Sequence, residues 1–356
     1  QSPRRQQSLP YERWQGSIMI LNTWILGLLI GQITIFTVIS FSAIHAFRIH
    51  LSWNYASSDE GQYRLENKTY LVAALMKFVM FVHLFLFALT ALALDEIAPL
   101  IIGAMCPVGV LASNDFGFPF LYLKIALVFI FSTWLMLNHI DNKMDNYPLV
   151  RLKYLYLVLF YPLIIIETVL FFLFLLNLDP MVITSCCGTV FNEANTDVTG
   201  TISSIPNIVI LPVLFGLTLF LLVTRFETIK NRINRVFGGI FEAAIWICYF
   251  IFSLLSVLSF ISIYIYEMPT HRCPFCFLQK EYSFIGFPLY FFLFLATTTG
   301  FNRGLLELVK WEDNLATTIE TFQSKLHKVS IISMIGFLLT GFLPFIFYYF
   351  RTGRLI

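Results

Sequence analysis

Long apolar runs separated by short polar segments dominate the chain. Eight of these runs are long enough to form membrane-spanning helices, because about 20 helical residues cross the hydrocarbon core of a bilayer. They lie at approximately 17–47, 70–94, 117–138, 154–178, 206–226, 238–266, 284–305 and 329–350. The pattern predicts an all-α, polytopic membrane protein of about eight transmembrane helices, surrounded by membrane lipid.

Composition supports this class. The chain is 58% hydrophobic and 12% charged, whereas charged residues make up about 25% of an average soluble domain. A net charge of +2 without a basic stripe gives no reason to expect nucleic acid. The sequence has no P-loop or dinucleotide fingerprint, so no nucleotide is expected. Of the histidines only His83 lies well inside a predicted span, so haem is not expected either.

Basic residues predict the orientation, because cytoplasmic loops of membrane proteins are enriched in Lys and Arg. Four alternate connections are basic, whereas the three between them contain only Arg272 and Lys280. We therefore expect an inner-membrane or plasma-membrane protein whose less basic loops face the periplasm or the cell exterior. With eight spans, this orientation places both termini on the external side, whereas the arginines near both ends of the chain favour the cytoplasmic side.

Five of the six cysteines fall in the predicted external loops. They are Cys106, Cys186, Cys187, Cys273 and Cys276, and only Cys248 lies within a span. Disulfides persist in oxidising outer compartments. The external cysteines are therefore the chemical cluster that the sequence predicts.

A repeated pattern follows two of these cysteines. Cys106-Pro is followed by Gly-Phe-Pro at 117–119, and Cys273-Pro by Gly-Phe-Pro at 286–288. Gly suits a tight turn and Pro suits the first turn of a helix. We interpret the chain as two tandem four-helix repeats. The predicted parts are a polar N-terminal segment (1–16), the first repeat (17–178), an external loop (179–205), the second repeat (206–350) and a C-terminal tail (351–356).

The CxxC motif at Cys273 and Cys276 is the sharpest chemical signal. Two cysteines at this spacing can form a redox disulfide or chelate one metal ion, and nearby cations lower a thiol pKa. His271, Arg272 and Lys280 can supply that positive charge. A structural disulfide is the alternative.

Adjacent Cys186 and Cys187 form a second signal. They can close a strained vicinal ring or pair with separate partners. Cys106 is one candidate partner, which would bridge the two halves. A purely structural bridge is as compatible with the sequence as redox chemistry, and connectivity cannot be deduced from spacing.

Two short motifs resemble the vitamin K epoxide reductase family of membrane disulfide oxidoreductases. They are Ser-Cys-Cys-Gly-Thr-Val-Phe-Asn around Cys186, and the run from Cys273 into Gly-Phe-Pro-Leu-Tyr at 286–290. The resemblance implies electron transfer between an external thiol protein and a quinone. Cys273 and Cys276 would then be the catalytic pair nearest the quinone, and Cys186 or Cys187 the relay. The order of the motifs and the number of spans differ from that family.

Two other functions use the same residues. Thiolates favour copper(I) and zinc, so Cys106, Cys186, Cys187, Cys273, Cys276 and His271 are candidate metal ligands if the external loops converge. Alternatively, the chain is a non-catalytic subunit of a larger membrane complex whose cysteines form structural disulfides. The leading hypothesis remains a membrane thiol–disulfide or electron-transfer protein.

Ionisable residues inside the predicted spans are costly to bury and usually face a partner or a cavity. Lys124 and Glu167 lie mid-span, and we interpret them as supporting functional residues or as partners of each other. Lys77, His83 and Glu242 are interpreted as structural.

Overall fold

The computed structural model describes residues 22–54, 59–144, 147–179, 181, 207–223, 232–269, 271–310 and 313–355. Every regular element in these ranges is a helix, which confirms the all-α fold class. The chain divides into two compact units, Gln1–Thr184 and Ser185–Ile356. The boundary falls inside the predicted external loop 179–205.

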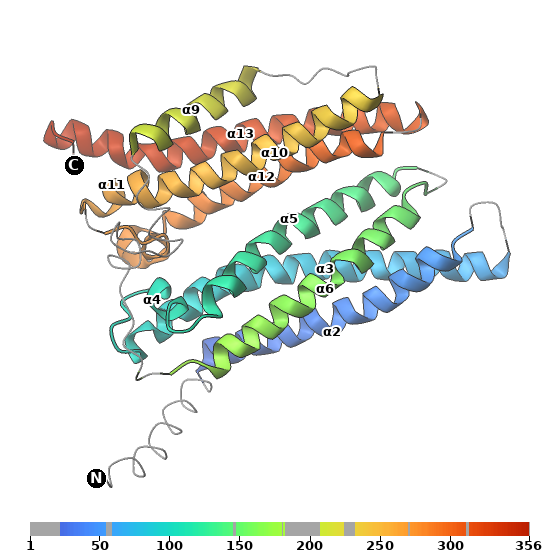
Figure 1. Cartoon of the computed structure of the whole chain (residues 1–356), viewed down its shortest axis with the longest axis horizontal. Helices are drawn as coiled ribbons and strands as arrows, with labels where there is room; N and C mark the ends of the chain where they lie inside the picture. The colour runs from blue at the N-terminus through green and yellow to red at the C-terminus, as the bar shows by residue number, and fades with distance from the viewer. Residues whose placement is uncertain are drawn as a thin grey trace, which may run out of the picture. The chain divides into compact units, whose positions relative to one another are not determined.

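The described residues of unit 1 form a bundle of four long helices. They are α2 (Thr23–Ser52), α3 (Glu60–Ile97), α5 (Gly117–Asp141) and α6 (Val150–Leu176). Helix α2 packs beside α3 and α6, and α5 also packs beside α3 and α6, so the four helices close a ring (Figure 1). Two short elements, η1 (Ala98–Leu100) and α4 (Pro107–Leu111), lie in the connection from α3 to α5.

In its described residues, unit 2 also has four main helices, in the same cyclic order of neighbours. They are α9 (Asn207–Val223), α10 (Arg232–Ser256), α12 (Gly286–Val309) and α13 (Asp313–Thr352). Helix α10 packs beside α9 and α12, and α13 packs beside the same two helices (Figure 1). Helix α10 continues through a π-helical segment, η2 (Val257–Ile261), into α11 (Ser262–Tyr266). The connection to α12 contains η3 (Cys276–Leu278) and η4 (Lys280–Tyr282).

Six helical stretches of the described chain are long and apolar enough to cross a membrane. They are Thr23–Ser52, Glu60–Leu100, Gly117–Asp141, Val150–Leu176, Arg235–Tyr266 and Ala316–Thr352. Two predicted spans are not among them. The described part of α9 comprises 17 residues, Asn207–Val223, and the residues on both sides of it lie outside the described ranges. Helix α12 has 24 residues, but its second half contains the polar residues Asn302, Arg303 and Glu307. A count of eight spans therefore stays a prediction.

Unit 1 buries several polar side chains within its bundle and exposes many large apolar side chains on its surface. Ile30, Phe81 and Leu159 are 66%, 73% and 67% exposed, whereas Lys124 and Glu167 are buried. In water such a surface would promote association. In a bilayer, lipid covers the apolar side chains and polar groups must find partners within the bundle. This distribution is that of an integral membrane protein.

Small residues bring α10 and α12 of unit 2 into close contact. A Cβ atom added to Gly304 would lie 2.6 Å from the carbonyl oxygen of Gly239 and 2.8 Å from the backbone nitrogen of Ala243. A Cβ atom on Gly300 would lie 2.0 Å from the nearest atom of the Trp246 ring. Gly239 and Ala243, like Gly300 and Gly304, are four residues apart, which is the spacing that allows membrane helices to approach closely.

Candidate functional site

Four of the six cysteines lie in the described residues. Cys273 and Cys276 occupy the connection between α11 and α12, and Cys106 precedes α4 as its N-cap residue. Cys248 lies in α10, within the predicted span 238–266, and its side chain is exposed. Cys186 and Cys187 lie outside the described residues, so their pairing and their relay role stay predictions.

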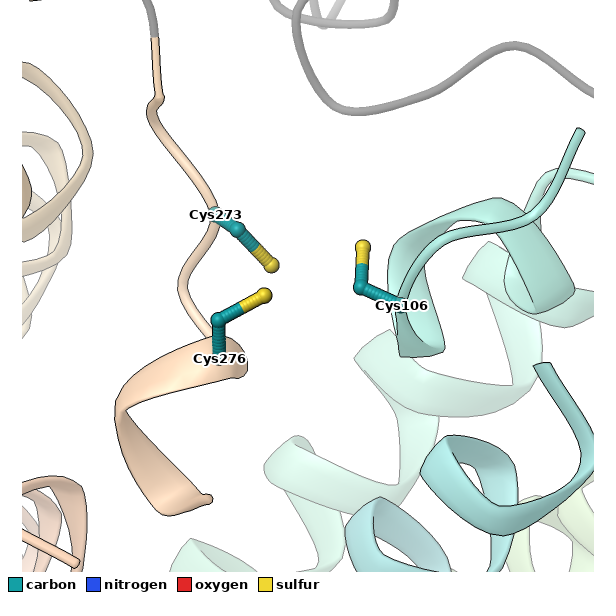
Figure 2. A group of neighbouring side chains, drawn as sticks. All are labelled: Cys106, Cys273 and Cys276. Atoms are coloured by element: carbon teal, nitrogen blue, oxygen red, sulfur yellow. The ribbon is translucent and has the colours of Figure 1, made fainter. Parts of the chain in front are cut away.

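The sulfur atoms of Cys273 and Cys276 lie within 4.8 Å of each other. Figure 2 shows Cys273 on an extended segment and Cys276 at the start of η3, with both side chains projecting to the same side of the loop. Both residues are buried, at 0% and 5% exposure. The backbone N–H of Phe275 donates to the Cys273 sulfur at 3.4 Å, and such a donor stabilises negative charge on sulfur. The geometry suits a dithiol that forms one disulfide or holds one metal ion.

Two tyrosine hydroxyls hold the backbone of this loop. The Tyr266 hydroxyl donates to the carbonyl oxygen of Cys273 at 2.6 Å and accepts from the backbone N–H of Phe277 at 3.1 Å. The Tyr290 hydroxyl donates to the carbonyl oxygen of Pro274 at 2.6 Å. Tyr266 ends α11 and Tyr290 lies in the first turns of α12, so the two flanking helices both contact the CxxC loop.

Three non-glycine residues of the connection have left-handed backbone conformations. The φ angles of Glu267, Ser283 and Phe284 are 55°, 53° and 55°. Side chains at such positions are uncommon, and each costs on the order of 1–2 kcal/mol. Contacts elsewhere in the unit must offset that cost, and the tyrosine hydrogen bonds to the loop are among them.

The predicted cationic residues flank the cysteine pair. The His271 ring packs edge-on against the Tyr266 ring with centroids 4.2 Å apart. His271 and Arg272 are half-buried, whereas Lys280 is exposed. Burial raises the pKa of Tyr282 in η4, and the negative charge of a Cys276 thiolate raises this pKa further.

Each Gly-Phe-Pro motif starts a helix against the connection that precedes it. Helix α5 begins at Gly117, where an added Cβ atom would lie 2.2 Å from the carbonyl oxygen of Leu111 at the end of α4. Helix α12 begins at Gly286, where it would lie 2.7 Å from the Phe277 ring and 3.0 Å from the Phe277 carbonyl oxygen in η3. Glycine is needed at both positions for close approach, and the tight turn expected from the sequence is only part of its role.

The two mid-span charges of unit 1 form a buried ion pair. Lys124 Nζ on α5 lies 3.0 Å from Glu167 Oε1 on α6, and both side chains are 1% exposed. Gln32 on α2 donates to Glu167 Oε2 and, at 3.2 Å, to Thr168 Oγ1. His83 Nε2 on α3 lies 3.2 Å from the Lys124 carbonyl oxygen. All four helices thus contribute to one polar cluster.

Other charged residues in or beside the predicted spans are partly paired. Glu242 on α10 forms an ion pair with Arg303 on α12 at 2.6 Å, and Lys77 is exposed. A second buried pair joins Lys153 to Asp141 at 2.6 Å in unit 1.

Sequence reasoning missed three polar residues that the tertiary structure makes important. Gln32 is an isolated amide inside an otherwise apolar helix, which is a signal that it needs a buried partner. Tyr266 and Tyr290 lie among many aromatic residues in a chain with 16 Tyr and 39 Phe, so nothing in the local sequence singled them out.

Comparison of the chain with protein-family models, with curated proteins and with solved structures found no match to any of them. The resemblance to the vitamin K epoxide reductase family therefore remains a motif-level expectation.

Proposed function

We propose that this protein is an integral membrane thiol–disulfide or electron-transfer protein whose redox centre is the Cys273/Cys276 pair. The observation that carries the proposal is the approach of the two sulfur atoms to within 4.8 Å on one short, tyrosine-held loop. The two side chains project to the same side of the loop (Figure 2), as the two partners of a disulfide with an S–S bond of about 2.05 Å must.

The reaction is a two-electron exchange. The Cys273 and Cys276 thiols lose two protons and two electrons as one S–S bond forms, and a quinone takes up both protons and both electrons to become a quinol. In the opposite half of the cycle an external protein dithiol attacks the Cys273–Cys276 disulfide. A mixed disulfide forms and resolves, leaving the partner oxidised and the pair reduced. Cys186 and Cys187 are the proposed relay to that partner.

Thiol trapping at fixed redox potential tests this proposal. The full chain in detergent is equilibrated with glutathione buffers between about −320 and −120 mV, which spans the known range of protein dithiols. Alkylation with a mass-tagged maleimide after denaturation then counts reduced thiols. We expect Cys273 and Cys276 to be lost together in one two-electron transition. Adding a water-soluble quinone to reduced protein should remove the same two thiols with one quinol formed.

Matched variants show which cysteines give rise to the two-electron transition. Cys273→Ser and Cys276→Ser should each abolish it, whereas Cys248→Ser, which removes the exposed α10 cysteine, should leave it unchanged. If both thiols stay reduced across the whole potential range, the redox function is wrong.

Burial of the pair favours a second candidate, a soft metal site. Cys273 is 0% and Cys276 5% exposed, and structural metal sites are closed to solvent. Zinc–sulfur bonds of about 2.3 Å place two tetrahedral thiolate ligands about 3.8 Å apart, which a small adjustment of the pair can reach. From the sequence, Cys106, Cys186, Cys187 and His271 are the candidates for further ligands.

Elemental analysis separates the two candidates. A metal site predicts about one zinc or copper ion per chain in protein purified without chelators, lost in Cys276→Ser and retained in Cys248→Ser. Substitution of Cys106 then tests whether it is an additional ligand. Protein with neither metal nor a redox transition would instead support a non-catalytic subunit of a larger membrane complex.

A further inference from the structure

The Tyr266 hydroxyl spans the two ends of the CxxC turn. It donates to the carbonyl oxygen of Cys273 at 2.6 Å and accepts from the N–H of Phe277, the residue after Cys276, at 3.1 Å. One phenol oxygen therefore fixes the backbone at the first cysteine and directly after the second. Because the Cα positions of a disulfide must lie within a narrow range of separations, fixing both ends also fixes how closely the sulfurs can approach.

The Tyr266 ring is itself held firmly. Its centroid lies 4.2 Å from that of His271, 4.6 Å from that of Tyr282 and 5.9 Å from that of Phe277. Tyr266 is 5% exposed, so water does not readily replace its hydroxyl in either hydrogen bond. The phenol is a rigid support whose position is set by α11 and by the loop's own aromatic residues.

Tyr290 supports the middle of the same turn from the other helix. Its hydroxyl donates to the Pro274 carbonyl oxygen at 2.6 Å, and its ring lies 5.7 Å from the Phe277 ring. The two tyrosines contact successive carbonyl groups, those of Cys273 and Pro274, from the helices on opposite sides of the loop.

We propose that Tyr266, assisted by Tyr290, is a positioning residue that sets the reduction potential of the Cys273/Cys276 pair. This inference rests on the proposed redox function. The two phenol hydroxyls hydrogen-bond to backbone groups of the loop, and they keep their protons in the cycle: the two protons released on disulfide formation leave with the quinone-class acceptor. Their effect is to limit the backbone freedom of the loop, which raises the effective concentration of one sulfur at the other and stabilises the disulfide.

Removal of one oxygen atom tests the proposal in the full chain. Tyr266→Phe keeps the ring contacts and deletes both hydrogen bonds to the loop. We expect the equilibrium constant for disulfide formation to fall about tenfold, which moves the midpoint potential by about 30 mV to less negative values. Tyr290→Phe, which deletes one hydrogen bond, should produce a smaller shift in the same direction.

Tyr264→Phe is the matched control. Tyr264 lies two residues before Tyr266, and its ring packs on Phe345 and Tyr348 of α13 at centroid distances of 4.9 and 5.7 Å. This variant should retain the wild-type potential. The melting temperature of every variant in detergent is measured alongside, because a change in stability without a change in potential marks a merely structural role.

The outcomes separate this inference from the proposed function. If the wild-type pair shows no transition, the redox function itself fails. If the wild-type pair cycles but Tyr266→Phe and Tyr290→Phe both keep its midpoint, the positioning role is wrong while the redox function stands. Should Tyr266→Phe fail to fold, the Tyr290→Phe measurement decides. An equal shift in Tyr264→Phe would also overturn the proposal, because it would assign the effect to general loss of a tyrosine hydroxyl.

Discussion

Lys124 on α5 and Glu167 on α6 form an ion pair at 3.0 Å in the centre of unit 1, with both side chains 1% exposed. Gln32 from α2 donates to the same carboxylate. Burying these charges costs free energy, which their mutual attraction and the surrounding hydrogen bonds offset. The pair therefore specifies which faces of three helices meet, and this makes it testable as a structural unit.

Removing one charge of this pair should destabilise the protein strongly. Lys124→Met or Glu167→Leu leaves an uncompensated buried charge, which typically costs about 3–5 kcal/mol. The double variant Lys124→Met/Glu167→Leu should recover most of that loss, since apolar residues often replace a buried pair at little cost. Thermal unfolding in detergent measures the stability of the single and the double variants. Arg64→Ala, which breaks the exposed Arg64–Glu60 pair, should leave the melting temperature unchanged. Additive losses in the double variant would contradict the pairing.

The glycines at the helix starts should resist substitution. In Gly117→Ala the new methyl group would lie 2.2 Å from the Leu111 carbonyl oxygen, and relieving such overpacking costs about 1–3 kcal/mol. Gly286→Ala should cost less, because its nearest neighbours at 2.7 and 2.8 Å are side-chain atoms of Phe277 and Leu278. Gly216→Ala in α9 is the control. Nothing lies within 4 Å of its Cβ position, so alanine should stabilise the helix by about 0.5–1 kcal/mol. Equal destabilisation at Gly117 and Gly216 would contradict the close approach of α4 and α5.

Contact between α10 and α12 should depend on Gly304. Gly304→Val places a branched side chain where even a Cβ atom would lie 2.6 Å from the Gly239 carbonyl oxygen. The two helices must then separate, which also disturbs the Glu242–Arg303 ion pair one position away. We expect the free energy of unfolding to fall by at least about 3 kcal/mol, measured by thermal unfolding of the full-length protein in detergent. A wild-type melting temperature would show that the two helices do not rely on this packing.

Helix α5 should cross the membrane completely. Asp115 precedes it and Lys143 follows it, and both residues are exposed. Single cysteines introduced at the two positions in a variant without native cysteines should react with an impermeant maleimide from opposite sides of the membrane. The basic-loop pattern further predicts that position 115 is external and position 143 is cytoplasmic. Labelling of both positions from one side would rule out a crossing by α5.

Local patterns in the sequence predicted most of the helices. The predicted span 117–138 is α5 (Gly117–Asp141), and 154–178 largely overlaps α6 (Val150–Leu176). Apolar run length determines such helices because each backbone group must be bonded within its own segment in lipid. Boundaries were less accurate where a helix continues beyond the apolar run. Helix α3 begins at Glu60 rather than near 70, because Asp59 caps a polar first turn.

The class of protein, the CxxC pair and the two glycine-led helix starts can be predicted without a structure, because each of them depends on neighbours along the chain. The burial cost of Lys124 and Glu167 likewise indicates that they need partners. The folded bundle adds that these two residues meet each other and Gln32, and that the Tyr266 hydroxyl lies between Cys273 and Phe277. Such contacts depend on how each helix is rotated and offset against the next, and those angles are set by packing across the whole bundle rather than by any local run of residues.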